Sequence, residues 1–361
     1  MKKSTFLLGL FFVFYCLFVI FKCTYLPFSS DMASYVLETN DILQGNFLLS
    51  GWWLQPALSV TTDFLFFLVG DLFCGISVYS HAIAVGLMIS TTVIIGFFMC
   101  RPASKSALCF YFFICAIPCM VAVDAYIAHL GTVICSFIAI YFTSKEFEQH
   151  QSQNLIIIGS ALFLGCFGDD ISILVGVFPI LIYCIASIFS KHGEEAEPRI
   201  CKRIILVIFI VIILIPISTK LYLMIGQASK TPTYASRAYF DPISKLGEKL
   251  VKYIISIFQV ADADFFGKAV FGSIANKKEV LSVGIFSSIL NGNINLSIKT
   301  PAYFIHALVI MSGLVISIKN IRRFICNDCN DAISTLLSIG ILCASIVFSF
   351  PFLVSIFISS L

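Results

Sequence analysis

The chain has 361 residues, of which 59% are hydrophobic and 12% are charged, and its formal net charge is +3. Soluble domains carry roughly a quarter charged residues, so this composition excludes an ordinary soluble protein and indicates a polytopic protein of the lipid bilayer. The small net charge, with no basic patch interleaved with aromatic residues, excludes nucleic acid as a partner. The fourteen cysteines lie mostly in apolar runs and predict no disulfide framework.

The first apolar run covers residues 6–21 and follows Lys2 and Lys3. It is longer than the apolar core of a signal peptide and lacks a small-x-small cleavage site, so we expect a retained first span. The lysines before it predict a cytoplasmic N-terminus. We expect a multi-pass protein of the plasma (inner) membrane. Residues 24–63 then form a first external loop, and residues 76–100 return the chain to the cytoplasmic side.

Two later apolar runs are each too long for a single span, because about 20 residues suffice to cross the hydrocarbon core. Residues 107–142 break on the outer side at VDAYIAH, which contains Asp124 and His129. Residues 155–189 break at GDD, residues 168–170, and lysines beyond both arms predict a hairpin. The first arm of that hairpin is short, which would place its aspartates below the outer membrane surface.

The last part of the chain contains a second long polar segment. After a polar cytoplasmic linker and an outward span, residues 220–300 form a large external loop. Two further apolar runs, residues 301–318 and those from 332 onward, complete about nine spans by the length rule. The prediction is an all-α polytopic membrane protein, a single transmembrane domain over residues 1–361 with two external loops that carry interfacial helices.

The first external loop contains a predicted helix. Ser29 or Ser30 can cap a helix that begins near Asp31, and the pair Gly45 and Asn46 can end it. Capping residues before an amphipathic run and a glycine after it indicate a helix of about four turns.

The periodicity of this helix predicts two different faces. At about 3.6 residues per turn, Asp31, Tyr35 and Glu38 share one face. We expect the opposite face to lie in the membrane interface and the acidic face to point toward incoming substrate. Trp52 and Trp53 suit the lipid headgroup zone, where amphipathic rings settle. The apolar face consists of Met32, Ala33, Val36 and Leu43.

Acidic residues are expected at several outer positions, namely the first loop, Asp124, Asp169 and Asp170. Carboxylates near or within a bilayer are costly and mark functional sites by default. The alternative is ordinary turn residues, since Gly-Asp is a common turn pair and loop carboxylates are usually solvated. The short arm that precedes Asp169 favours a functional role for that residue.

The segment SSDMASYVLETNDILQGNFLLSGWW, residues 29–53, resembles the first external loop of the GT-C membrane glycosyltransferases, the superfamily of protein O-mannosyltransferases and the lipid A aminoarabinose transferase. The run TTDFLFF from Thr61 is similar to the start of the second span in that family. Mannosyltransferases carry Glu where this chain has Met32, and relatives are commonly longer, so the chain resembles a short or truncated member. The residues that match the family pattern are Asp31, Tyr35, Gly45 and Asn46.

The resemblance implies that a sugar passes from a polyprenyl-phosphate donor to an acceptor at the external face. An acceptor hydroxyl is a poor nucleophile, so a carboxylate that takes its proton would assist attack on the anomeric carbon. Asp31 is the candidate base, and one carboxylate suffices where that carbon is inverted. Tyr35, Glu38, Asp169 and Asp170 are candidates for substrate or donor binding.

The lipid phosphate that leaves in this reaction needs cations in a partly dry setting. Arg237 is the first candidate, because a guanidinium grips phosphate with two hydrogen bonds, and Lys230 is the next. Lys245 lies on a predicted amphipathic helix that follows Asp241 and Pro242. The alternative for such lysines is contact with anionic lipid headgroups.

Two other classes of function stay open. A transporter or flippase for an envelope lipid or solute would also place carboxylates in spans, but it should show repeated halves with broken helices, and we find none. A noncatalytic membrane scaffold is the other alternative. The sequence predicts no cofactor and no metal site, although a divalent metal is left open. It also leaves open the acceptor and a partner subunit.

Overall fold

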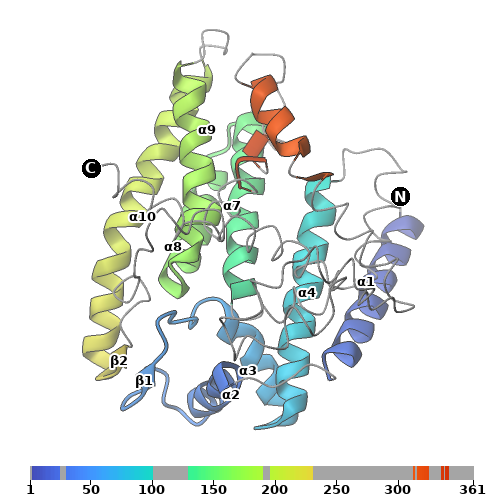
Figure 1. The fold of residues 1–361 in the computed structure, drawn as a ribbon, viewed down its shortest axis with the longest axis vertical. Helices are drawn as coiled ribbons and strands as arrows, with labels where there is room; N and C mark the ends of the chain where they lie inside the picture. Colours follow the sequence, from blue (N-terminus) through green and yellow to red (C-terminus); the bar gives the residue numbers. More distant parts are fainter. Residues whose placement is uncertain are drawn as a thin grey trace, which may run out of the picture.

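The computed structural model shows a bundle of long helices with shorter helices at one end (Figure 1). Among the residues that it describes, three helical stretches are long and apolar enough to cross a membrane, Val78–Met99, Leu130–Gln149 and Pro198–Gly226. The chain is therefore a mostly helical membrane protein, while the expected total of about nine spans involves residues outside the described ranges. The described residues are 2–24, 30–100, 129–189, 196–230, 312–313, 315–324, 335–336 and 338–340.

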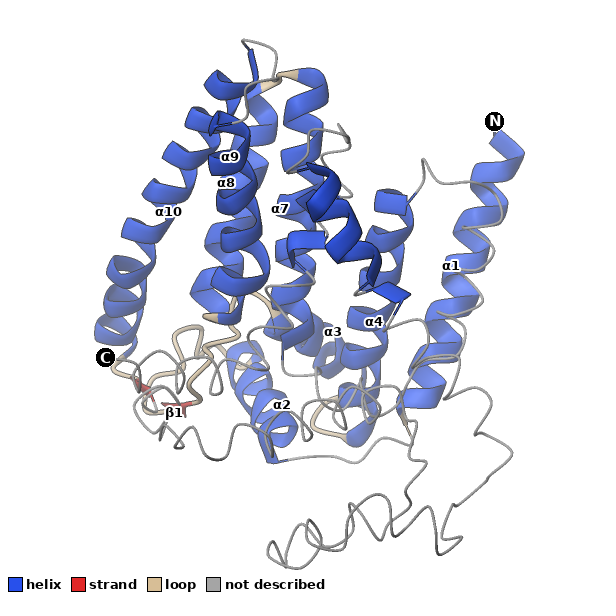
Figure 2. Cartoon of the chain, turned by 45° about the horizontal axis from the view of Figure 1, so that its top comes forward, coloured by secondary structure: helices blue, strands red, loops and turns tan. Residues whose placement is uncertain are grey.

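Apolar runs of this length form helices because a bilayer offers no water to bond their backbone N–H and C=O groups. The long helices are α1 (Lys2–Cys23), α4 (Val78–Cys100), α7 (Leu130–Gln149), α8 (Ser152–Gly168) and α10 (Ala196–Gly226), and a π-helical turn η2 (Ile173–Val177) continues into α9 (Phe178–Phe189). At one end lie α2 (Ser30–Leu43), α3 (Asp63–Cys74) and the two-residue strands β1 (Trp53–Leu54) and β2 (Ser229–Lys230), as Figures 1 and 2 show. We call this the α2 end of the bundle.

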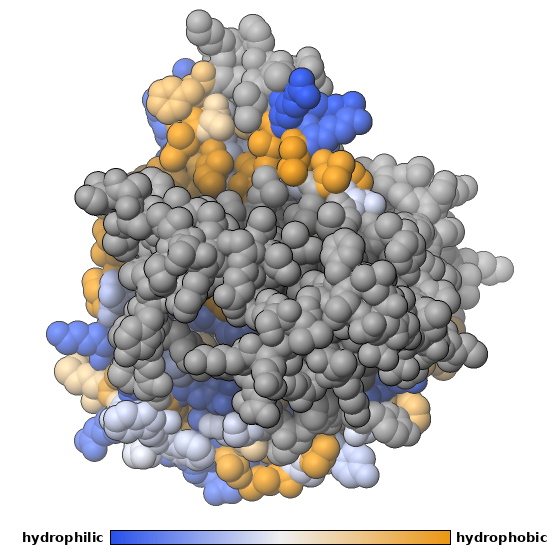
Figure 3. Space-filling model, in the orientation of Figure 1, coloured by the Kyte–Doolittle hydropathy of each residue, from blue (hydrophilic) through white to orange (hydrophobic). Residues whose placement is uncertain are grey.

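The sides of the bundle suit contact with lipid. α10 exposes large apolar side chains along its length, among them Phe209, Ile213 and Ile217. Figure 3 shows hydrophobic side chains, in orange, at the surface of the described part. A surface of this kind is costly in water and is the expected surface of a helix in hydrocarbon.

The break predicted at residues 168–170, within the apolar run 155–189, is confirmed. α8 ends at Gly168, and Asp169 has an extended backbone before η2 begins. We predicted that the first arm starts at residue 155. It is longer, because Ser152 and the polar residues after it form its first turn. Its 17 residues span about 25 Å at roughly 1.5 Å per residue.

The predicted boundaries of the next helix are wrong. We expected a polar linker over residues 191–203, a span over residues 204–217 and an external loop from residue 220. α10 instead runs from Ala196 to Gly226 and includes charged residues at both ends. Lys and Arg are good helix formers, and their long side chains keep the charge in water while the stem lies along apolar surface, so charge alone does not end a helix.

A buried carboxylate joins three helices at the end opposite to the α2 end. Glu146 of α7 is fully buried and accepts a hydrogen bond from Asn154 of α8 at 3.2 Å. Arg203 of α10 lies 3.6 Å from the same carboxylate and also donates to Ser152 at 3.2 Å. Lys145 lies beside this group. We predicted that this end is cytoplasmic, and its basic residues agree with that orientation, which stays a prediction.

Candidate functional site

The helix predicted in the first loop is confirmed as α2, which begins at Ser30 and ends at Leu43. Gly45 follows with φ +104°, a backbone conformation that glycine adopts without strain. The Asn46 side chain continues the turn, because its Oδ1 accepts a hydrogen bond from the Ser50 N–H at 2.8 Å. The helix packs against α3 and α4 at the α2 end.

The predicted division of α2 into an acidic outer face and an apolar inner face is wrong. Tyr35 and Glu38 are buried together with Met32 and Val36, whereas Asp31 is exposed. The reason is that α2 packs on polar groups of the neighbouring helices instead of on a purely apolar surface. Its buried face can therefore contain a phenol and a carboxylate.

Hydrogen bonds hold this buried face in place. The hydroxyl groups of Tyr35 and Ser59 lie 2.8 Å apart and share a hydrogen bond. The hydroxyl groups of Thr39 in α2 and Ser80 in α4 both bond to the Asp71 carboxylate of α3. Burial raises the pKa of Asp71, and these two hydroxyls act against that shift. The three helices are thus joined through one carboxylate.

We expect Asp71→Ala to lower the free energy of unfolding by about 2 kcal/mol, because it leaves two buried hydroxyls without their acceptor. Thermal unfolding of the purified protein in detergent measures the loss. Leu72→Ala is the matched control, since Leu72 follows directly in α3 and is 70% exposed. Equal melting temperatures for the two variants would show that the Asp71 contacts do not fix α2.

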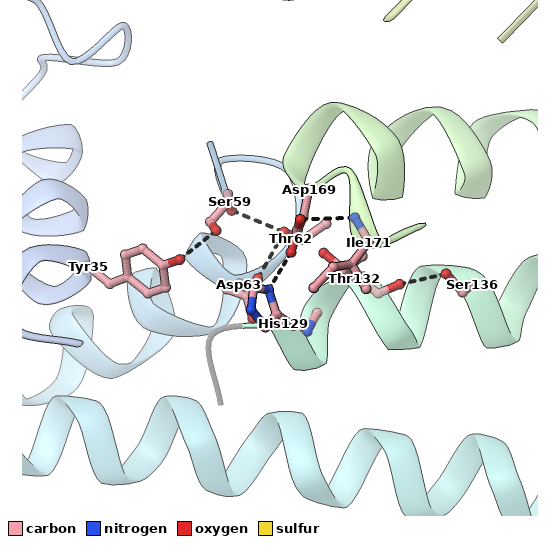
Figure 4. A network of polar contacts seen from close by, with 10 residues as sticks. Tyr35, Ser59, Thr62, Asp63, His129, Thr132, Ser136, Asp169 and Ile171 are labelled. Atoms are coloured by element: carbon pink, nitrogen blue, oxygen red, sulfur yellow. Dashed lines mark hydrogen bonds and ion pairs between the residues drawn. The ribbon is translucent and has the colours of Figure 1, made fainter. Parts of the chain in front are cut away.

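Three titratable side chains from distant parts of the sequence meet at the α2 end (Figure 4). Asp63 begins α3, His129 precedes α7, and Asp169 follows α8. His129 Nδ1 and Asp169 Oδ2 form a hydrogen-bonded ion pair, in which the histidine side chain is 31% exposed. Asp169 Oδ1 also accepts the N–H of Ile171 at 3.1 Å, so both of its oxygens are bonded.

Asp63 is fully buried. Its carboxylate accepts the Gly131 N–H at 3.1 Å and the Thr62 hydroxyl at 3.0 Å. Burial raises the pKa of Asp63 to about 6, although the two hydrogen bonds and the charge of His129 act in the opposite direction. A carboxylate with such a pKa can exchange a proton near neutral pH.

His129 differs from an isolated buried histidine. Burial disfavours its charged form, but the hydrogen bond and the charge of Asp169 outweigh burial, and the charge of Asp63 adds to them, so the pKa of His129 is raised. When Nδ1 donates to the Asp169 carboxylate, Nε2 is left to accept a proton. The pair has the arrangement of an oriented general base.

Two glycines allow the three chain segments to approach so closely. A Cβ on Gly131 would lie 2.6 Å from the Thr62 carbonyl carbon and 2.7 Å from the Asp63 nitrogen. A Cβ on Gly168 would lie 2.6 Å from Thr62 Oγ1, and the Gly168 carbonyl accepts the Ser59 N–H at 2.9 Å. The cluster is therefore built on close contacts between backbone atoms.

The first loop also contacts the segment that follows α10. β1 and β2 pair in parallel, with Trp53 opposite Ser229 and Leu54 opposite Lys230. The Ser229 N–H donates to the Trp52 carbonyl at 3.0 Å. This pairing places Lys230 beside the first loop, and that both loops lie on the outer side of the membrane stays a prediction.

The other residues proposed from the sequence lie in different surroundings. Asp31 is exposed, and its carbonyl accepts a hydrogen bond from Gln55 at 3.2 Å. Asp170 is exposed as well, next to the buried Asp169. The roles proposed for Asp31 as base and for Tyr35, Glu38, Asp169 and Asp170 in binding stay predictions. Asp124, Arg237 and Lys245 lie outside the described residues.

The tryptophans of the first loop differ from each other. The Trp52 indole N–H donates to Asp41 Oδ2 at 2.8 Å, and Asn46 donates to the same oxygen at 2.6 Å. Trp53 is 68% exposed. A place for both rings in the headgroup zone stays a prediction.

The sequence did not lead us to Asp63, and it placed His129 only in the break on the outer side of residues 107–142. The signal for Asp63 was present, because Thr62 and Asp63 stand directly before an apolar helix, where capping residues gather. No local signal pairs His129 with Asp169, since the two are 40 positions apart.

Within the described residues, no group of three or more His, Cys, Asp or Glu side chains is arranged to hold a metal ion. Comparison of the chain with protein-family models, with curated proteins and with solved structures finds no match.

Proposed function

We propose that the chain is a membrane glycosyltransferase that moves a sugar from a polyprenyl-phosphate donor to an acceptor at the external face. One observation supports this proposal above the others. The His129–Asp169 pair and the buried Asp63 lie at the same end of the bundle as α2, whose sequence resembles the first loop of the GT-C enzymes. In this proposal the α2 end faces outward from the plasma membrane and the N-terminus is cytoplasmic.

The proposed reaction needs one proton acceptor. The acceptor oxygen forms a bond to the anomeric carbon, the bond from that carbon to the phosphate oxygen breaks, and the acceptor proton passes to the base. Two groups at the α2 end suit this role. Asp31 is the candidate from the sequence and is exposed, and Nε2 of His129, oriented by Asp169, is the candidate from the geometry.

The departing polyprenyl phosphate carries negative charge that a cation would stabilise. Lys230 lies within the predicted large external loop, and β1 and β2 bring it next to the first loop. In the proposal Lys230, Arg237 and Lys245 share the binding of this phosphate. Carboxylates and cations would then occupy separate parts of the site, with the acceptor near the carboxylates.

Asp31→Asn and His129→Gln distinguish the two candidate bases. We expect the substitution of the true base to lower transfer about 100-fold or more and that of the other candidate to have a much smaller effect. Mass spectrometry of cell-envelope glycans, with and without each variant, measures the transfer. Glu148→Gln is the control, because Glu148 is exposed near the opposite end of α7. If the glycan profile is the same with and without the wild-type protein, the proposal is wrong.

The buried titratable cluster also suits a transporter, since Asp and His groups at such positions can relay protons. An unchanged glycan profile together with altered solute uptake would favour that function.

A further inference from the structure

One face of α7 carries polar or small side chains from one end of the helix to the other. Leu130–Gln149 is one of the three described stretches that can cross a membrane. Steps of three and four residues keep to one face of a helix, and here they lead from the histidine before α7 to a glutamate near its end. The residues on these steps are His129, Thr132, Ser136, Ala139, Thr143 and Glu146.

This polar face of α7 is turned into the protein and away from lipid. Its members within the helix, from Thr132 to Glu146, are all 0% exposed. The Ser136 hydroxyl donates to the Thr132 carbonyl at 3.0 Å and lies 3.2 Å from the hydroxyl of Ser172. A Cβ on Gly176 would lie 2.9 Å from Ser136 Oγ, so η2 packs directly on this face. Polar groups at such a place are costly unless they are bonded.

Three polar atoms of this face bond to none of the described residues, namely Thr132 Oγ1, Thr143 Oγ1 and Glu146 Oε1. Thr132 stands three positions after His129, and Thr143 stands three positions before Glu146. Each unpaired hydroxyl is therefore a neighbour, one helical turn away, of a titratable side chain. Buried polar groups are rarely left unpaired in native proteins, and buried water that bonds several of them is their usual partner.

Both ends of the face can exchange protons with the solution. At the α2 end, His129 is 31% exposed and pairs with Asp169. At the opposite end, Glu146 Oε1 lies 3.6 Å from Nη1 of Arg203, whose side chain is 45% exposed. Acids and histidines placed along membrane-spanning helices are typical of proton relays.

We propose that the polar face of α7 conducts protons across the membrane along a chain of buried water molecules. Each hydroxyl or water accepts a proton from one neighbour and gives its own to the next. All groups return to their starting state, so one proton moved across the membrane is the net result. This activity goes beyond glycosyl transfer and does not depend on it.

The middle of the path is its narrowest part. The methyl group of Ala139 offers no hydrogen bond, and Ser136 and Thr143 are about 10 Å apart along the helix at roughly 1.5 Å per residue. Water molecules about 2.8 Å apart would bridge this distance with about three members. We expect this step to limit the rate of conduction.

Thr143→Val and Thr132→Val test the path, because Val keeps the shape of Thr and removes only the hydroxyl. Removing an unpaired buried hydroxyl should leave the melting temperature unchanged or higher. Each change should slow proton conduction about tenfold, since the chain loses one hydrogen bond. Thr92→Val is the matched control, because the Thr92 hydroxyl donates to the Met88 carbonyl at 2.9 Å within α4.

The measurement uses the purified full chain in phospholipid vesicles that contain a pH-sensitive dye. A potassium gradient with valinomycin sets the membrane potential, and the dye follows the entry of protons. We expect faster entry with the wild type and Thr92→Val than in vesicles without protein. Entry should be slower with Thr143→Val and with Thr132→Val than with the wild type.

Proton entry with the wild type that equals that of protein-free vesicles overturns the path. Equal rates for the wild type and both path variants overturn it too. A slower rate that comes with a lower melting temperature would mean that the hydroxyls only support the structure, and it has the same consequence. Thr143 lies far from the candidate site, so Thr143→Val should leave glycosyl transfer unchanged. Proton entry that the path variants slow, in a protein that transfers no sugar, supports the path and contradicts the proposed transferase.

Discussion

Gly131→Ala should lower the free energy of unfolding by about 3 kcal/mol, one of the two largest effects that we expect. The new Cβ would lie 2.6 Å from the Thr62 carbonyl carbon and 2.7 Å from the Asp63 nitrogen, and neither backbone atom can rotate away. The first turn of α7 must therefore move away from α3. Overpacking of this kind costs about 1–3 kcal/mol, and the weakened hydrogen bond from the Gly131 N–H to the buried Asp63 carboxylate adds to it.

Thermal unfolding in detergent, followed by circular dichroism, measures this change. Gly9→Ala is the matched control, because a Cβ on Gly9 of α1 meets nothing within 4 Å. In a helix Ala is favoured over Gly by about 1 kcal/mol, so the control should be as stable as the wild type or slightly more stable. If both variants melt alike, the close approach of α3 and α7 is not a source of stability.

The parts of this fold that local sequence could predict are those with local physical causes. Gly45, with its positive φ, and the polar residues around it stop α2, and the sequence shows this directly. α8 ends at Gly168, where the backbone of Asp169 becomes extended, and the Gly-Asp-Asp sequence indicates this break. Turn residues and capping residues act on their own neighbours, so no knowledge of the tertiary structure is needed.

The orientation of α2 could not be predicted in this way. Periodicity assigns Tyr35 and Glu38 to a face, but which face is buried depends on what the neighbouring helices offer. Asp71 of α3 accepts a hydrogen bond from Thr39, and Ser59, which precedes α3, shares one with Tyr35, so a polar face could be buried there. A sequence pattern that equates burial with apolar residues fails where buried polar groups find partners.

The centre of the candidate site depends on contacts across the chain. The Gly131 N–H and the Asp63 carboxylate are 68 positions apart, and their contact exists only because α3 and α7 pack closely. Asp169 was a candidate from the sequence, because it follows a break in an apolar run. The partner of Asp169 could be identified only from the fold. His81 and His129 have similar apolar surroundings in the sequence but different neighbours in the structure.

The His129–Asp169 pair predicts a dependence of stability on pH. The folded pKa of His129 lies above its ordinary value of 6.5, so the pair stabilises the fold fully below that value and loses this contribution as pH rises through the raised pKa. Asp169→Asn removes the charge of Asp169 that raises the pKa of His129, whereas burial, which lowers it, remains. The melting temperature of that variant should therefore change less with pH than that of the wild type over this range.

If His129 is the base, Asp169→Asn should lower glycosyl transfer about 100-fold and move its pH profile, which is the second of the two large effects. The base must be neutral, so wild-type activity falls as pH drops through the raised pKa of His129. With the Asp169 charge removed, burial lowers that pKa, and the fall in activity on the acidic side of the pH profile moves to lower pH. The amide oxygen can still accept from Nδ1, so the variant tests charge with little change in packing. If activity falls about 100-fold but the acidic side of the pH profile does not move, Asp169 acts on something other than His129.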